Sequence, residues 1–145
     1  MALEYLWHTG RLAVARREGF QKVYDLSERV LGEAWQAPLP DEAQFVDWAC
    51  AGALERLGFA TPGELAGFWN LVTHREAKAW CTANLGGRVR LVELGSDDGA
   101  APRRLYARAD WRQALDEAAR PPARLRVLNP FDPVLRDRQR LQWLF

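Results

Sequence analysis

Cysteine, long apolar runs and net charge are all scarce in this sequence. Only two of its 145 residues are cysteines, Cys50 and Cys81, and neither has a second cysteine or a histidine at the spacing of metal ligands. We expect both to be reduced core residues. No run approaches the roughly 18 uncharged apolar residues that a membrane span needs, and the N-terminus lacks the regions of a signal peptide. These absences predict a soluble cytoplasmic protein with no membrane contact.

The usual signatures of enzyme chemistry are also missing. The sequence contains no nucleophile with an adjacent base, no pair of carboxylates in a recognisable site and no phosphate-binding loop. It therefore predicts no catalytic residue, no metal site and no cofactor in this chain.

The charge that is present is unevenly distributed, although the net charge is only +1. Residues 1–60 carry a net charge of −3 and residues 61–100 carry −1, whereas residues 101–145 carry +5. A polyanion responds to the local potential rather than to the average. The basic C-terminal third is therefore compatible with a nucleic-acid partner, although the net charge of the whole chain is small.

One pattern occurs twice along the chain. Gly10–Val14 (GRLAV) follows a helical stretch, and so does Gly87–Leu91 (GRVRL); each leads through a turn into a second strand-like segment that contains a tyrosine, Tyr24 or Tyr106. A helix, a glycine stop and a two-stranded wing form the last part of a winged helix-turn-helix. The pattern predicts an α+β fold, mainly α, with one complete winged unit and the terminal helix and wing of a preceding unit.

The first predicted domain, residues 1–36, is that partial unit. It contains a helix over 2–9, strands over 11–16 and 20–26, and a short helix that Ser27 is expected to cap. Two prolines within 37–40 make that segment a linker.

The second predicted domain, residues 37–120, is the complete unit. Three capping boxes predict three helix starts, because each pairs an aspartate or threonine with a glutamine or glutamate three residues later. The predicted helices span 41–57, 61–69 and 73–85. Strands over 88–94 and 103–108 form the wing, and a helix over 110–119 follows. Three helices and a hairpin in this order are typical of a winged helix.

The third of these helices is the candidate for reading DNA. Its N-terminal end would enter the major groove and presents His74, Arg75 and Lys78. The alternative is that the two cations form an ordinary solvated face and that His74 has no function. On the opposite face, four residues at helical spacing are expected in the core: Ala77, Trp80, Cys81 and Leu85.

The tip of the first hairpin is a second candidate contact. Arg16, Arg17 and Lys22 bracket it, with Phe20 and Gln21 between them, and such a finger suits a DNA backbone or minor groove. Phe20 would either stack on a base or cover an apolar neighbour.

The second wing is expected to approach DNA only at its base. Arg103 and Arg104 lie there, whereas Asp97 and Asp98 at the tip would repel phosphate.

The third predicted segment, residues 121–145, is a linker and a final helix. The polar face of this helix would consist of Asp132, Arg136, Asp137, Arg138 and Arg140. The opposite stripe of Leu135, Leu141, Leu144 and Phe145 is expected to pack on the body or on another domain.

Three stretches carry a resemblance to a known family. They are residues 3–14 (LEYLWHTGRLAV), 19–31 (GFQKVYDLSERVL) and 129–138 (NPFDPVLRDR), followed by the terminal Leu144-Phe145. They resemble the winged-helix DNA crosslink-repair glycosylases, the YcaQ/AlkZ-like family. The resemblance implies tandem winged helix-turn-helix units followed by a β-barrel, a cleft for double-stranded DNA, and removal of alkylated or crosslinked bases without a metal.

The sequence departs from that family at the catalytic motif. Family catalysis resembles water activation by a Gln-apolar-Gln or Gln-apolar-Asp motif, and this chain has neither. We therefore expect the DNA-binding central portion of a glycosylase, in contact with a missing N-terminal unit and a C-terminal barrel. The alternative is a winged-helix module without enzymatic activity, either regulatory or protein-binding.

Overall fold

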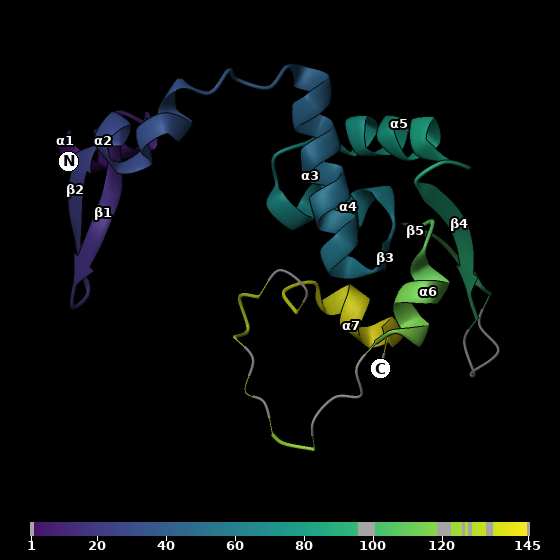
Figure 1. The fold of residues 1–145 in the computed structure, drawn as a ribbon. Coiled ribbons are helices and arrows are strands. Elements are labelled where there is room, and N and C mark those ends of the chain that lie inside the picture. The colour runs from purple at the N-terminus through teal and green to yellow at the C-terminus, as the bar shows by residue number, and fades with distance from the viewer. Residues whose placement is uncertain are drawn as a thin grey trace. The chain divides into compact units, whose positions relative to one another are not determined.

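The computed structural model describes residues 2–95, 101–118, 123–125, 127, 129–132 and 135–144 (Figure 1). The chain divides into two compact units, Met1–Pro40 and Asp41–Phe145. Helices and small antiparallel sheets give a mixed α+β fold. Among the helices of these ranges, none is long and apolar enough to cross a membrane.

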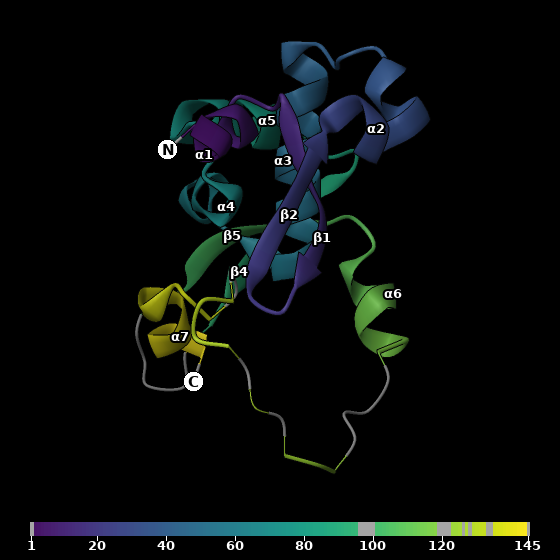
Figure 2. The ribbon, with the colours of Figure 1, turned by 90° about the vertical axis from the view of Figure 1, so that its left-hand side faces the viewer.

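The first unit is a hairpin between short helices. Its elements are α1 (Ala2–His8), β1 (Leu12–Glu18), β2 (Gln21–Leu26), α2 (Ser27–Leu31) and the 3-10 turn η1 (Gly32–Gln36). The predicted helix and strands are thus confirmed. Figure 2 shows β1 and β2 side by side along their length.

A bulge at Ala15 decides which residues share a face of this hairpin. The pairing of β1 with β2 shifts between Val14 and Arg16, so Arg17 lies opposite Lys22 and Arg16 lies opposite Val23. Residues directly opposite each other in an antiparallel pair lie on the same face. Arg17 and Lys22 therefore share one face, and Arg16 lies on the other.

The predicted role of Ser27 as a helix cap is wrong. Ser27 is the first residue of α2, the preceding Leu26 is the N-cap, and no side chain caps the helix. The Ser27 hydroxyl is buried and donates to the Gly10 carbonyl at 2.6 Å. A buried hydroxyl needs a hydrogen-bond partner, so Ser27 ties α2 back to the start of β1 instead.

The second unit consists of helices on a three-stranded sheet. Its elements are α3 (Glu42–Leu57), β3 (Phe59–Ala60), α4 (Pro62–Trp69), α5 (His74–Asn84), β4 (Val89–Leu94), β5 (Arg103–Arg108), α6 (Trp111–Asp116) and α7 (Arg138–Leu144). The sheet order is β3-β5-β4, so the hairpin β4–β5 gains a third short strand from between α3 and α4.

All three predicted capping boxes are confirmed. Asp41 with Gln44, Thr61 with Glu64 and Thr73 with Glu76 each make both reciprocal hydrogen bonds. The turn between α4 and α5 begins at Asn70, which ends α4 in the left-handed conformation. These local signals fix where α3, α4 and α5 begin.

The core of the second unit lies where these helices meet the sheet. Its buried residues include Leu54 and Leu57 of α3, Leu65 of α4, and Trp80 of α5. Ala77, Trp80 and Cys81 are buried as predicted, but Leu85 is 49% exposed because it follows α5 in an extended conformation as its C-cap.

Cys50 and Cys81 are free and fully buried, as predicted. Burial raises the pKa of the Cys50 thiol to about 11 and that of Cys81 to about 12, so both stay protonated at neutral pH.

In the described part of the C-terminal segment, Arg140 does not lie where the sequence predicts. Arg140, expected on a polar helix face, is 2% exposed and pairs with Glu64 of α4. The tip of the second wing, with Asp97 and Asp98, lies outside the described residues, as does Phe145 of the predicted apolar stripe.

Candidate nucleic-acid interface

The outer face of α5 presents the predicted cations to solvent. His74, Arg75 and Lys78 are exposed, as is Thr82 one turn later. The inner face of the same helix, with Ala77, Trp80 and Cys81, is buried. The helix therefore offers a polar face with donors for phosphates and base edges at its N-terminal end.

The start of α5 lies beside the first turn of α4. A methyl group placed on Gly63, in the first turn of α4, would stand 3.8 Å from Cδ2 of His74. The capping box of α5 also orders this end, because the Glu76 carboxylate accepts hydrogen bonds from the backbone N–H and the hydroxyl of Thr73, both at 2.6 Å. These bonds lower the pKa of Glu76.

A polar network around Asp47 of α3 anchors the other end of α5. Trp80 Nε1 donates to Asp47 Oδ1 at 2.8 Å, and the Arg88 guanidinium makes an ion pair with the same carboxylate. Arg88 also donates from Nε to Asn84 Oδ1 at 2.9 Å. One aspartate thus joins α3, α5 and the residue before β4, and the hydrogen bond from Arg88 lowers its pKa.

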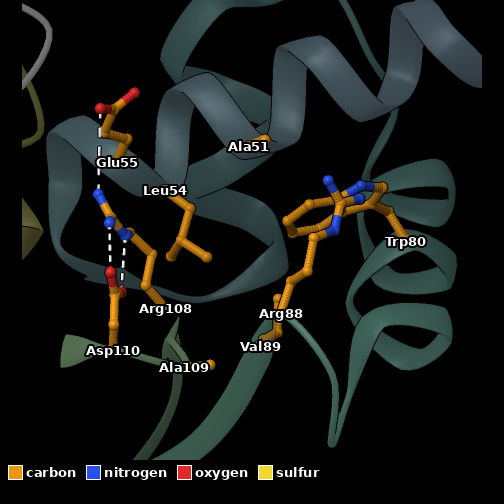
Figure 3. A pocket seen from close by; sticks show the side chains of 9 residues that line it. All are labelled: Ala51, Leu54, Glu55, Trp80, Arg88, Val89, Arg108, Ala109 and Asp110. Atoms are coloured by element: carbon orange, nitrogen blue, oxygen red, sulfur yellow. Dashed lines mark hydrogen bonds and ion pairs between the residues drawn. The ribbon is translucent and has the colours of Figure 1, made fainter.

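A hollow of about 460 Å³ lies beside this network, between α3 and the base of the wing (Figure 3). Ala51, Leu54, Trp80 and Val89 contribute apolar lining, and two arginines lie at its sides. Arg108 pairs with Asp110 at 2.5 Å and with Glu55 at 3.9 Å.

Both arginines of the hollow are therefore engaged by carboxylates. Arg88 pairs with Asp47, and Arg108 pairs with Asp110. The hydrogen bond from Arg108 lowers the pKa of Asp110. These ion pairs compensate the charges of both arginines inside the unit. The hollow therefore offers little net charge to a phosphate.

The hairpin of the first unit separates its three cations. Arg16 is 2.7 Å from Glu18 on its own strand. On the opposite face, Lys22 Nζ lies 3.6 Å from the centre of the Trp7 ring, next to Arg17 across the ladder. Arg17 and Lys22 are therefore the cationic pair of this hairpin, while the charge of Arg16 is neutralised locally.

The remaining predicted contacts lie at the hairpin tip and the base of the second wing. Phe20 is fully exposed and Gln21 is exposed beside it, so Phe20 covers no apolar neighbour. At the second wing, Arg104 pairs with Glu93 at 3.1 Å, and Arg103 is exposed beside it.

Sequence reasoning missed the residues that hold α5 in place. Asp47, Asn84 and Arg88 are in no predicted site, although Arg88 belongs to the repeated Gly-Arg pattern that marks the end of each helix. Asn84 lies four positions before Arg88, but Asp47 lies 41 positions before it. The pattern could have indicated an anchoring arginine, but not its partner.

The described residues contain no cluster of three or more histidine, cysteine, aspartate or glutamate side chains that could hold a metal ion. That the chain works without a metal stays a prediction. The candidate site is therefore a surface. It consists of the exposed N-terminal end of α5, whose opposite face is buried in the core.

Comparison with known proteins agrees with a DNA-directed role. No solved structure was found to match the chain. The sequence model of the family described as DNA glycosylase AlkZ-like matches residues 1–145, which is the whole chain. DNA is the partner that this match implies. The chain therefore belongs to the AlkZ-like DNA glycosylase family.

Proposed function

We propose that this chain is the DNA-binding portion of a glycosylase that removes alkylated or crosslinked bases, and that its second unit is a winged helix-turn-helix. In this proposal α4 and α5 are the helix-turn-helix pair, α5 is the reading helix, and β4–β5 is the wing.

One observation carries the proposal: the order of the elements together with the order of the strands. The helix α3 is followed by a short strand, then by α4, α5 and a hairpin, and the short strand pairs with the far strand of that hairpin. In a helix-turn-helix the second helix of the motif enters the major groove by its N-terminal residues. In this chain those residues are His74, Arg75 and Lys78, which are exposed.

We propose that the hairpin β1–β2 makes a second, backbone-directed contact. Its cations are Arg17 and Lys22 on one face, with Phe20 and Gln21 at the tip. Arg16 contributes less because Glu18 compensates its charge. Arg103 and Arg104, at the base of the second wing, would add to the contact of the second unit. A lesion-repair protein meets its target in any sequence, so phosphate contacts should dominate over base contacts.

We assign no catalytic residue in this chain. The glutamine motif that the resemblance implies for water activation is not in the sequence, which also has no recognisable pairing of a nucleophile with an adjacent base. We propose that these units bind the duplex, while the glutamine motif, where the family carries it, activates the water that hydrolyses the N-glycosidic bond.

A salt series of duplex binding tests the proposal. Fluorescence anisotropy would compare the wild-type chain with the double variant Arg75→Gln/Lys78→Gln and with the control Arg112→Gln, an exposed arginine on α6. Each lost phosphate contact should reduce the slope of log affinity against log salt by about 0.9, and the control should change nothing.

Two results would count against the proposal. An unchanged affinity and slope in the double variant would mean that α5 is not the contact. Release of an alkylated base from duplex DNA by the purified chain would contradict the assignment of catalysis elsewhere.

A further inference from the structure

Arg140 is an unusual arginine because it is almost completely buried. Its side chain is 2% exposed, and that of its partner Glu64 is 12% exposed, with 2.9 Å between Nη1 of Arg140 and Oε1 of Glu64. Nη2 of Arg140 donates to the Leu57 carbonyl, also at 2.9 Å. The guanidinium stands 5.2 Å from the centre of the Phe59 ring.

These bonds join the end of one helix to the start of the next. Leu57 is the last residue of α3, so its carbonyl has no partner within that helix and accepts from Arg140 instead. Glu64 lies in the first turn of α4 and uses its other oxygen, Oε2, to accept from the Thr61 backbone at 2.6 Å. Arg140 therefore bonds the carboxylate that completes the capping box of α4.

A second arginine of the same segment holds the opposite end of α4. Nη2 of Arg136 donates to the carbonyls of Gly67 and Phe68 in the last turn of α4, at 2.7 Å and 3.0 Å. Cations at a helix C-terminus bond its free carbonyls and complement its dipole. Asp137 accepts from the Arg140 backbone at 3.1 Å and so orders the start of α7 between the two arginines.

We infer that Arg140 is a positioning residue for the DNA-reading end of α5: through Glu64 it clamps the C-terminal segment onto α4 and fixes the first turn of α4, which lies beside His74. Arg140 bonds Glu64 in the first turn of α4, and a methyl group placed on Gly63 of the same turn would stand 3.8 Å from Cδ2 of His74. Arg140 is itself too deeply buried to touch a phosphate. The part of this inference that concerns DNA rests on the proposed function.

Hydrogen exchange of the full chain without DNA tests the clamp directly. In Arg140→Met, amides of residues 61–66 and 138–144 should exchange about tenfold faster or more. In the wild type, local opening must break the buried ion pair, and the variant no longer has that free-energy cost. The matched control is Arg138→Met, which removes an exposed arginine two positions away on the same helix and should change neither region. Unchanged protection in Arg140→Met would overturn the inference.

A double variant covers the case in which Arg140→Met does not fold because Glu64 is left buried and unpaired. Arg140→Met/Glu64→Gln removes both charges, and a buried pair can be replaced in this way at little cost in folding. The glutamine still offers an oxygen to the Thr61 backbone. The double variant should fold with α7 released, and wild-type protection of residues 138–144 in it would overturn the clamp.

Duplex binding separates positioning from contact. Arg140→Met should lower affinity by about fivefold at fixed salt, a usual size for coupling through packed elements. The slope against salt should stay at the wild-type value, because the number of phosphates neutralised is unchanged. A slope lower by about 0.9 would make Arg140 a phosphate contact and overturn the positioning role.

The two arms also separate failure of this inference from failure of the proposed function. Faster exchange with unchanged affinity would overturn the positioning role and leave the proposed function standing. A wild-type chain that does not bind duplex DNA would overturn the proposed function, and the role of Arg140 in positioning a DNA-reading helix would fall with it, whereas the exchange data would still decide whether the clamp exists.

Discussion

The two units of this chain are stabilised in different ways. Among the described residues, every buried hydrophobic side chain lies between Ala49 and Ala107, in the second unit, whereas Ser27 is the one buried residue of the first. The first unit is held by a two-stranded ladder and by ring contacts such as that of Trp7 with Tyr24 at 6.2 Å. Isolated two-stranded hairpins are marginally stable in water.

Because the two units differ in this way, substitutions should affect stability in some places and binding in others. The second unit has a core into which the inner face of α5 packs. The first unit has cations and a fully exposed phenylalanine on a hairpin whose described residues include no buried hydrophobic side chain. Substitutions of buried side chains in the second unit should act on folding, whereas surface substitutions in either unit should act mainly on partners.

The largest expected effect is a matched pair of leucine substitutions, one in each unit. Leu65→Ala removes a fully buried side chain of α4 and should lower the free energy of unfolding by about 2–5 kcal/mol. Leu3→Ala, at a leucine that is 57% exposed in α1, should change it by about 0.5 kcal/mol or less. Urea denaturation measures both. Equal losses would break the comparison between the two units.

A smaller effect is expected at the Asp47 network. Asp47→Ala leaves Trp80 Nε1 without its acceptor and Arg88 without its carboxylate partner, and should cost about 1–3 kcal/mol of unfolding free energy. Asp47→Asn keeps an acceptor for Trp80 and loses only the charge. Because the Asp47 side chain is 40% exposed, that charge should contribute about 1 kcal/mol or less.

The pH dependence of this contribution follows from the direction of the Asp47 pKa shift. Its pKa is lowered in the folded chain, so the stabilising charge is fully present above the unfolded carboxyl value of about 3.9. It is lost as the pH falls through the lower folded value. Wild type and Asp47→Asn should therefore differ at pH 6 and converge in acid. A difference in unfolding free energy that is constant from pH 6 to pH 3 would contradict this account.

The smallest expected effect is on the hairpin of the first unit. Arg17→Gln should weaken duplex binding a few-fold and lower the salt slope by about 0.9, whereas Arg16→Gln should leave the slope nearly unchanged because Glu18 already compensates Arg16. Neither variant should shift the unfolding of the second unit. The opposite ranking of the two arginines would mean that the face with Lys22 and Trp7 is not the contact.

Local signals predicted the fold better than they predicted the contacts between distant residues. Capping boxes such as Thr61 with Glu64 depend on neighbours three positions apart, and all three formed. The burial of Arg140 depends on Glu64, 76 positions away, and a periodic polar pattern could not reveal that partner. The Ala15 bulge exchanges the faces of Arg16 and Arg17, although both read alike as tip cations in sequence.

The candidate site was predictable as a set of residue types but not as an arrangement. His74, Arg75 and Lys78 are exposed as helical spacing indicates, because the opposite face carries the apolar residues. The DNA-binding role of these residues stays a prediction. Asp47 and Arg88, which anchor α5, come from elements far apart in sequence, and their pairing appears only once the helices pack.

The most direct test of the central claim, that α5 is the DNA-reading helix, is a titration of the isotopically labelled chain with duplex DNA, followed by amide chemical shifts. The account predicts that the largest changes fall on residues 73–78 and on the hairpin residues 17–22, and that they diminish as salt is added. Changes centred instead on the exposed Trp48 and Leu71, with residues 73–78 unaffected, would contradict it.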